Sequence, residues 1–288
     1  MVDSIKLPAP GKLNLFLHVM GRRADGYHQL QTLFQFIDLA DELEFVRCDH
    51  NQIEVEGDLI GVSAEQNLIY KAAKLLQQQS GVEQGVRIFC KKRLPVGGGV
   101  GGGSSDAATT LVGLNHLWGC EYTSAQLQSL GLQLGADVPI FIYGQSAFAK
   151  GVGEVFTAAE PPESYYLLLQ PEACVSTAKI FSHLALTRDT SAIKMSACSP
   201  RAMGNDLQSI VCQLYPEVAA CLDWLSQRVP ARMTGSGSVV FAEFSTEDEA
   251  KALAKKVPNR YKAYVCKGCN QSPLQMAVSV QYWGVAKR

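Results

Sequence analysis

Six glycines occupy the seven positions from 97 to 103, and two serines follow them directly. Glycine loses more backbone entropy on folding than any other residue, so this density indicates main chain that takes positive φ or closely approaches a ligand. Backbone N–H groups, together with the positive end of a helix expected to begin near the first serine, would stabilise phosphate oxygens. The segment therefore predicts a nucleotide phosphate loop formed by Pro95, Gly97, Gly98, Gly99, Gly101, Gly102, Gly103, Ser104 and Ser105.

Other loop types fit this segment less well. A flexible hinge, with the first serine only as a helix N-cap, would not normally run straight into an alanine-rich helix. Gly97, Gly99 and Gly102 satisfy the dinucleotide pattern G-x-G-x-x-G, and Glu121 follows about 20 residues later. That pattern requires Glu121 to end a second buried strand, whereas residues 120–126 are polar. A Walker-type loop needs a lysine where this chain has a serine.

The elements that must position this loop follow from hydrophobic periodicity. Alternation predicts strands over 13–19 and 30–39, joined by a turn at Asp25-Gly26. Helices are predicted over 68–80, 105–118, 124–134, 205–227 with a break near Pro216, and 247–257, and further strands over 86–90, 165–170 and 239–244. Strands and helices interleave without regular alternation, which favours the α+β class. Glycines and prolines cluster near residues 151–162, so we expect a nucleotide-binding domain over 1–155 and a substrate-binding domain over 156–288.

Composition limits the class of partner. The 288 residues are 47% hydrophobic, which is enough to bury a substantial core. A formal net charge of −1 leaves no broad basic field, so we expect a small-molecule substrate and neither nucleic acid nor a membrane as a partner. Nine cysteines without framework spacing, and no secretory signal, predict a reducing cytoplasmic location.

Three separated segments resemble the motifs of the GHMP kinases, the superfamily of galactokinase, homoserine kinase, mevalonate kinase and phosphomevalonate kinase. They are residues 10–15 (PGKLNL), 95–108 and 234–237 (TGSG). The resemblance implies a two-domain α+β kinase, with an N-terminal ATP domain like ribosomal protein S5 and a ferredoxin-like C-terminal domain.

Further blocks narrow the resemblance. Residues 21–28 (GRRADGYH), 92–95 (KRLP) and 135–139 (GADVP) resemble the family of kinases that phosphorylate the 2-hydroxyl of 4-diphosphocytidyl-2-C-methyl-D-erythritol, in the non-mevalonate route to isoprenoid precursors. Two departures stand out: Gly11 replaces the usual alanine before the lysine, and the tail over 277–288 has no counterpart.

This resemblance implies catalytic roles for two residues. Asp137 would accept the proton of the attacking hydroxyl or orient that hydroxyl, and Lys12 would keep the carboxylate ionised and offset charge on the transferring phosphoryl group. The alternatives are an Asp137 that only caps a helix with Pro139 in its first turn, and a Lys12 that is a solvated surface lysine.

The same resemblance implies the binding residues. The substrate would contact Asn14, Tyr27, His28, Thr177 and Phe181, with Tyr27 and Phe181 stacked on cytosine and His28 hydrogen-bonded to its edge. Asn67, Leu68 and Lys92 would contact the adenine side of ATP. Without the resemblance, the aromatic residues would be interpreted as core or turn residues, and Lys92 with its charged neighbours as a solvated strand end.

ATP is expected as its Mg²⁺ complex, although the sequence identifies no metal ligands. Cys266 and Cys269 have the spacing of half a zinc site, but no second pair accompanies them, so we expect two reduced thiols. Competing hypotheses are a kinase acting on mevalonate or homoserine, a dinucleotide-dependent oxidoreductase, and a non-catalytic nucleotide sensor. The expected assembly is a monomer or a homodimer.

Overall fold

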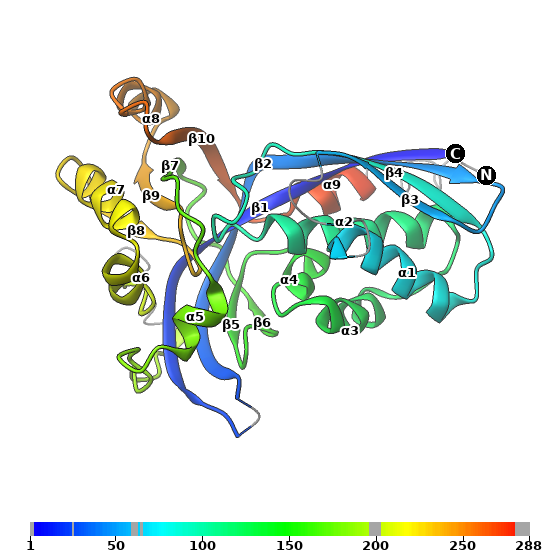
Figure 1. Ribbon diagram of the computed structural model, residues 1–288, viewed down its shortest axis with the longest axis horizontal. Helices are drawn as coiled ribbons and strands as arrows, with labels where there is room; N and C mark the ends of the chain where they lie inside the picture. Colours follow the sequence, from blue (N-terminus) through cyan, green and yellow to red (C-terminus); the bar gives the residue numbers. More distant parts are fainter. Residues whose placement is uncertain (1–2, 25, 59–62, 64–65, 196–202, 280–288) are drawn as a thin grey trace.

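Two long antiparallel strands organise the molecule. The computed structural model describes residues 3–24, 26–58, 63, 66–195 and 203–279. Strands β1 (Ser4–Arg22) and β2 (His28–Cys48) pair from Ser4 opposite Val46 to Arg22 opposite His28, and they run through both halves of the molecule (Figure 1). The predicted strands were the inner parts of this hairpin, and both are longer because buried apolar positions continue outward, for example Leu7 and Phe45.

The remaining strands extend from β2. They are β3 (Ile53–Gly57), β4 (Gly85–Lys91), β5 (Ala147–Lys150), β6 (Val155–Ala158), β7 (Tyr165–Gln170), β8 (Ala231–Met233), β9 (Val240–Phe244) and β10 (Lys262–Cys269). The sheet path is β3-β4-β2-β10-β7-β9-β8, with β1 and β5 also paired to β2. Strand β2 therefore changes partners along its length, from β5 to β10 to β4, and this joins the two halves in one sheet.

The helices gather into two groups (Figure 1). They are α1 (Leu68–Ser80), α2 (Gly102–Leu117), α3 (Ser124–Leu134), α4 (Val138–Tyr143), α5 (Thr177–Ser182), α6 (Gln208–Leu214), α7 (Pro216–Ser226), α8 (Glu247–Ala254) and α9 (Pro273–Val278). Helices α1 to α4 and α9 pack under the sheet of β1, β2 and β4, and α5 to α8 surround β7, β9 and β10. Within the described ranges, none of these helices combines the length and apolar character needed to cross a bilayer.

Three buried clusters fill the molecule. One lies between β1, β2 and β4 and the first group of helices, and another lies between β7, β9 and the second group. The third joins them and includes Leu13 of β1, Val100 of the glycine loop and Phe241 of β9. The molecule is thus the α+β structure that the sequence predicted, while the domain division at residue 155 stays a prediction.

The helix after the glycines begins earlier than predicted. Helix α2 starts at Gly102, not near Ser104 or Ser105, and Gly101 is its N-cap with φ 76°. An N-cap in the left-handed region favours glycine, which explains why the glycine run continues into the helix. Ser104 therefore is not the N-cap, and the hinge interpretation of this segment is wrong.

Candidate active site

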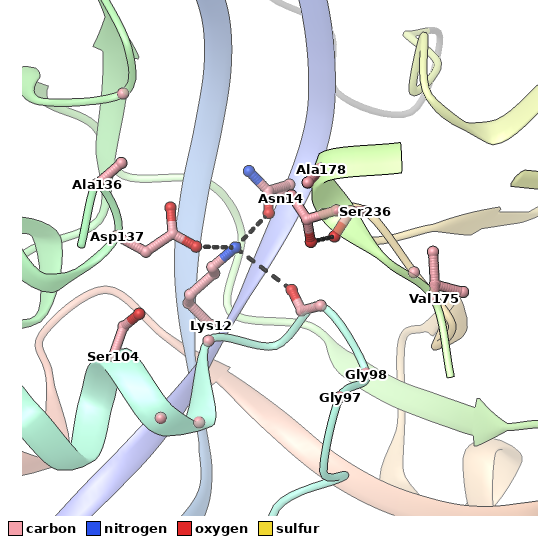
Figure 2. Close-up of a pocket in the computed structure, with 18 of the residues that line it drawn as sticks. Lys12, Asn14, Gly97, Gly98, Ser104, Ala136, Asp137, Val175, Ala178 and Ser236 are labelled. Atoms are coloured by element: carbon pink, nitrogen blue, oxygen red, sulfur yellow. Dashed lines mark hydrogen bonds and ion pairs between the residues drawn. The ribbon is translucent and has the colours of Figure 1, made fainter. Parts of the chain in front are cut away.

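One pocket of about 890 Å³ collects almost all of the predicted site residues. Its walls come from β1, the start of α1, the glycine loop, the segment before α4, α5 and the turn over 235–237. Figure 2 shows Lys12, Asn14, Asp137 and Ser104 around this space, with Ser236 and Ala178 across from them. Of the predicted residues only Ser105 is absent from the lining, because its side chain is fully buried in α2.

Lys12 is a buried ammonium with three acceptor oxygens close to its nitrogen. Its Nζ donates to Asn14 Oδ1 at 2.6 Å and to the Gly99 carbonyl at 3.3 Å, and it lies 3.1 Å from Asp137 Oδ2 (Figure 2). Only 3% of the side chain is exposed, so the solvated-lysine interpretation is wrong. Lysines are almost never buried unless paired, and here the carboxylate and two dipoles compensate the charge.

Asn14 holds that ammonium in place. Its side chain points to the same face of β1 as Lys12, and its Nδ2 donates to Thr32 Oγ1 at 2.8 Å. Because Thr32 fixes the amide nitrogen, the amide oxygen must face Lys12. The backbone N–H of Asn14 also donates to Thr234 Oγ1 at 2.8 Å, which connects β1 to the third motif.

Asp137 takes the N-cap position of α4 but makes no side-chain capping bond. Its carboxylate instead pairs with Lys12 and is 39% exposed, so one oxygen faces the ammonium while the group stays accessible from the pocket. Pro139 lies in the first turn of the helix, as predicted. The purely capping role is therefore excluded, and the helix start serves to place the carboxylate opposite Lys12.

The glycine loop places its main chain against two neighbours. Gly99 has φ 79°, and a Cβ there would lie 2.5 Å from the Thr234 carbonyl. A Cβ on Gly101 would lie 2.8 Å from the Phe141 ring. The first helical bond of α2 runs from Ser105 N to the Gly101 carbonyl, so the N–H groups of residues 102–104 have no partner within the helix. These three donors and the helix dipole make the start of α2 a site for anionic oxygens.

The residues predicted for the adenine side of ATP lie beside a buried charge network. Asn67 is the N-cap of α1 and its side chain accepts from Ile69 N, as expected for a helix start. Lys92 Nζ is paired with Asp41 and lies 2.7 Å from Asp106. Burial, and beyond it the neighbouring Asp41 carboxylate, raises the pKa of Asp106 although Lys92 opposes this. Lys92 is therefore no solvated strand end, in contrast to the exposed Lys91.

Asp41 and Asp106 were not predicted. Both are buried, and Asp41 also accepts from the backbone N–H groups of Arg93 and Leu94, at 2.5 and 2.8 Å. It thereby fixes the chain that leads into the glycine loop. Asp106 follows the two serines directly and could have been noticed, but Asp41 is one of several acidic residues in β2 and carries no local signal of its own.

The other end of the pocket is aromatic. His28 is buried and its ring lies 5.0 Å from that of Phe181, while Tyr27 is 61% exposed at the rim. Thr177 Oγ1 lies 2.7 Å from Ser236 Oγ, which joins the start of α5 to the third motif. Arg22 and Ser236 also line the pocket. Both lie in motifs that the sequence analysis recognised, over 21–28 and 234–237, but no role was assigned to either residue.

The described part of the structure does not support two alternative functions of the sequence, dinucleotide binding and a zinc site. Glu121 lies in the loop between α2 and α3 with φ 57°, not at the end of a second strand, so the dinucleotide arrangement is absent from the described region. Cys266 and Cys269 are free thiols, and burial raises the pKa of Cys269 to about 11. Among the described residues no three His, Cys, Asp or Glu side chains form a metal-binding group.

Comparison with known proteins agrees with this geometry. The family models described as GHMP kinases N terminal domain and GHMP kinases C terminal match residues 67–145 and 192–263. A protein of Shewanella putrefaciens (strain CN-32) named 4-diphosphocytidyl-2-C-methyl-D-erythritol kinase is 50% identical over 268 residues, 93% of this chain and 94% of that protein. A protein of Azoarcus sp. (strain BH72) with the same name is 52% identical over 267 residues, 93% and 95% of the two chains.

Solved structures give the same result. The crystal structure of 4-(cytidine 5'-diphospho)-2C-methyl-D-erythritol kinase superposes with a TM-score of 0.80 at 32% identity, covering 92% of this chain and 99% of that one. A mevalonate kinase superposes with a TM-score of 0.67 at 16% identity over 93% of this chain and all of that chain, and this shows the shared fold alone. The chain therefore belongs to the 4-diphosphocytidyl-2-C-methyl-D-erythritol kinase family of the GHMP kinases.

Proposed function

We propose that this protein transfers the γ-phosphoryl group of ATP to the 2-hydroxyl of 4-diphosphocytidyl-2-C-methyl-D-erythritol, in the non-mevalonate route to isoprenoid precursors. The observation that carries the proposal is the Lys12–Asp137 pair beside the glycine loop. That pair lies in the same pocket as Tyr27, His28 and Phe181, so a nucleotide site and an aromatic site border one reacting centre. Ligand pockets commonly span about 300–1,000 Å³, and a pocket of about 890 Å³ suits two substrates.

The reaction follows from the placement of these groups. The substrate hydroxyl would attack the γ-phosphorus in line with the leaving ADP oxygen, and Asp137 would accept the hydroxyl proton or orient the hydroxyl. Lys12 would stabilise both the carboxylate and the charge on the transferring group. Because phosphoryl transfer asks mainly for positioning, the three acceptors that immobilise Lys12 are part of its chemistry.

Each substrate would have its own part of the pocket. The N–H groups at the start of α2 would bind the ATP phosphates, with Asn67, Leu68 and Lys92 on the adenine side. Tyr27 and Phe181 would stack on cytosine, with His28, Asn14 and Thr177 as polar contacts. The buried Ser105 would contribute its helix position, not its hydroxyl.

Magnesium would accompany ATP. The described residues provide no carboxylate cluster, and Asp41 and Asp106 already pair with Lys92, so phosphate oxygens would supply most of its ligands. The Ser104 hydroxyl at the pocket wall is the protein oxygen best placed to join them. When bound, the ion would neutralise negative charge on the phosphate oxygens.

The test is ADP release with Mg²⁺-ATP and four acceptors: the cytidyl methylerythritol substrate, mevalonate, homoserine and galactose. Turnover with the first alone is expected. Turnover with another acceptor instead would refute the substrate, and no turnover with any would refute the proposed reaction. The free state of all eight described cysteines supports a cytoplasmic location, which fractionation of cells would check.

A further inference from the structure

Arg188 lies behind the aromatic end of the pocket and does not line it. Its Nε donates to His28 Nε2 at 3.0 Å. Its two other nitrogens donate to three carbonyls in the segment around it, those of Phe181 at 3.0 Å, His183 at 2.7 Å and Leu186 at 3.1 Å. Two of these carbonyls belong to the C-terminal end of α5, where helix carbonyls lack helical partners and a cation is favourable.

The contact between Arg188 and His28 fixes where the imidazole proton is. A guanidinium has only N–H donors and keeps its charge at every ordinary pH, so the nitrogen that faces it must offer a lone pair. The ring of His28 is therefore neutral, and its proton is on Nδ1. Free imidazole side chains in water favour the opposite tautomer, with the proton on Nε2.

We infer that Arg188 is a positioning residue that holds His28 as a neutral ring protonated on Nδ1, and so makes His28 a hydrogen-bond donor toward the bound base. This inference rests on the proposed function, since it assigns the substrate end of that site. A donor-only ring selects a base that presents an acceptor, such as an unprotonated ring nitrogen or a carbonyl oxygen, and rejects one that presents an N–H at that place.

Burial and the charges around His28 also favour the neutral form of its ring. The charged groups that face its ring are Arg188, from the segment after α5, and Arg22, opposite His28 across the β1–β2 hairpin. Burial first, and then these two cations, hold the pKa of His28 below its usual value. The ring also lies at 38° to the Phe181 ring, and Arg188 binds the backbone carbonyl of Phe181, so one guanidinium contacts both the His28 ring and the chain that carries Phe181.

The direct test is nuclear magnetic resonance of the complete protein labelled with ¹⁵N-histidine, without ligand. Long-range ¹H–¹⁵N correlations distinguish the two tautomers, and the missing signal of a His28→Asn variant would identify His28 among the five histidines. At pH 7.5 we expect a neutral ring with the proton on Nδ1. A ring protonated on Nε2, or on both nitrogens, would overturn the inference whether or not Arg188 variants fold.

Kinetics supply the second test. In Arg188→Met the tautomer should become mixed, the pKa of His28 should rise, and KM for the cytidyl substrate should increase about tenfold, the effect of one hydrogen bond. The kcat and the KM for ATP should stay within about twofold, since Arg188 contacts neither the predicted ATP-binding residues nor the Lys12–Asp137 pair. Lys179→Met, which removes an exposed cation from α5, the helix whose C-terminal carbonyls Arg188 binds, should leave all these values unchanged.

The outcomes separate this inference from the proposed function. An unchanged tautomer in Arg188→Met, or KM values that rise alike for both substrates, would reduce Arg188 to a structural residue and overturn the inference. A chain that shows the Nδ1 tautomer but never phosphorylates the cytidyl substrate would refute the proposed function, while the assignment of the His28 proton would stand.

Discussion

At the scale of single residues, Lys12 is the point where the three motifs meet. Its backbone N–H donates to the Val100 carbonyl at 2.9 Å, its ammonium reaches Gly99, and its neighbour Asn14 is bonded to Thr234. The ammonium therefore lies at a fixed place between the phosphate loop and Asp137. This arrangement suits a group whose charge must be in position before the phosphoryl group moves.

Replacing Lys12 should separate its proposed catalytic role from general effects of charge. Lys12→Met is expected to lower kcat/KM by about 10²–10³, the range seen when one preorganised charge donor is removed. Lys6→Met is the matched control on the same strand, since that side chain is 55% exposed and forms its ion pair with Glu42 at the surface. Steady-state kinetics of both variants would decide, and equal effects would contradict the role of Lys12.

Asp137→Asn should affect turnover far more than binding. The amide keeps the shape and the helix-start position but cannot take a proton, so kcat should fall by about 10²–10⁴ while KM for both substrates changes by only a few-fold. Pre-steady-state phosphoryl transfer would measure the chemical step directly. Near-normal turnover would contradict both the proton-accepting and the orienting role.

The Asp106 carboxylate should reveal itself in the pH dependence of stability. Since burial raises its pKa in the folded state, its stabilising contribution is full below the unfolded pKa of about 4 and is lost as pH rises through the folded pKa. The difference in free energy of unfolding, wild type minus Asp106→Asn, should therefore decrease from pH 4 to pH 8. Urea unfolding at several pH values checks this, and a constant difference would contradict it.

At the scale of elements, the glycine loop and the third motif touch through their backbones. The Val239 N–H donates to the Gly98 carbonyl at 3.1 Å, and a Cβ on Gly235 would lie 2.6 Å from the Gly99 carbonyl. Asn205 holds the third motif from behind by donating to the Gly235 carbonyl at 2.8 Å. The glycine loop is therefore positioned by the C-terminal half of the chain, although its sequence lies in the N-terminal half.

Gly99→Ala should disturb the contact between the glycine loop and the third motif, in addition to straining the backbone at residue 99. Gly119→Ala is the matched control, because Gly119 also has positive φ, 66°, but a Cβ there meets nothing within 4 Å. Both variants should lose about 1–2 kcal/mol from the left-handed conformation. Only Gly99→Ala should lose further free energy of unfolding, and only this variant should show a KM for ATP raised about tenfold or more. Thermal unfolding and ATP kinetics test this, and identical behaviour of the two variants would contradict the close approach.

At the scale of the whole molecule, elements from the C-terminal part of the chain pack against the N-terminal half. Helix α9, at the end of the described sequence, packs into the core of the N-terminal half through Leu274 and Val278. Strand β10 reaches the same half by pairing with β2 at Phe36 and Ile37. The two halves are therefore connected by strands from both ends of the chain, and we expect them to unfold together.

Leu274→Ala should test this connection. The side chain is fully buried, so its loss should lower the free energy of unfolding by about 2–5 kcal/mol. Met276→Ala on the same helix removes a side chain that is 42% exposed and should cost less than about 1 kcal/mol. Denaturant unfolding followed by two probes would show one shared transition, and a shift confined to one probe would contradict the joint unfolding.

Local signals in the sequence were sufficient for several elements. Helix α3 and strand β7 have the predicted bounds, α6 and α7 break at Pro216, and Thr246 with Glu249 forms the capping box that opens α8. Short strands such as β5 and β8 were missed, since three or four residues carry too little periodicity to be recognised. Their existence depends on strand partners far away in the chain.

The sequence by itself determined the dense glycine run and the family resemblance, because a glycine run and motif residues at fixed spacing are local properties. The resemblance implied roles for Lys12 and Asp137, and the tertiary structure brings these two side chains together. Only the tertiary structure decided that Asp41 and Asp106 share Lys92, and that Arg188 donates to His28. Those contacts join residues between 14 and 160 positions apart. No local pattern encodes which distant donor meets which acceptor, because packing of the sheet and its helices settles that choice.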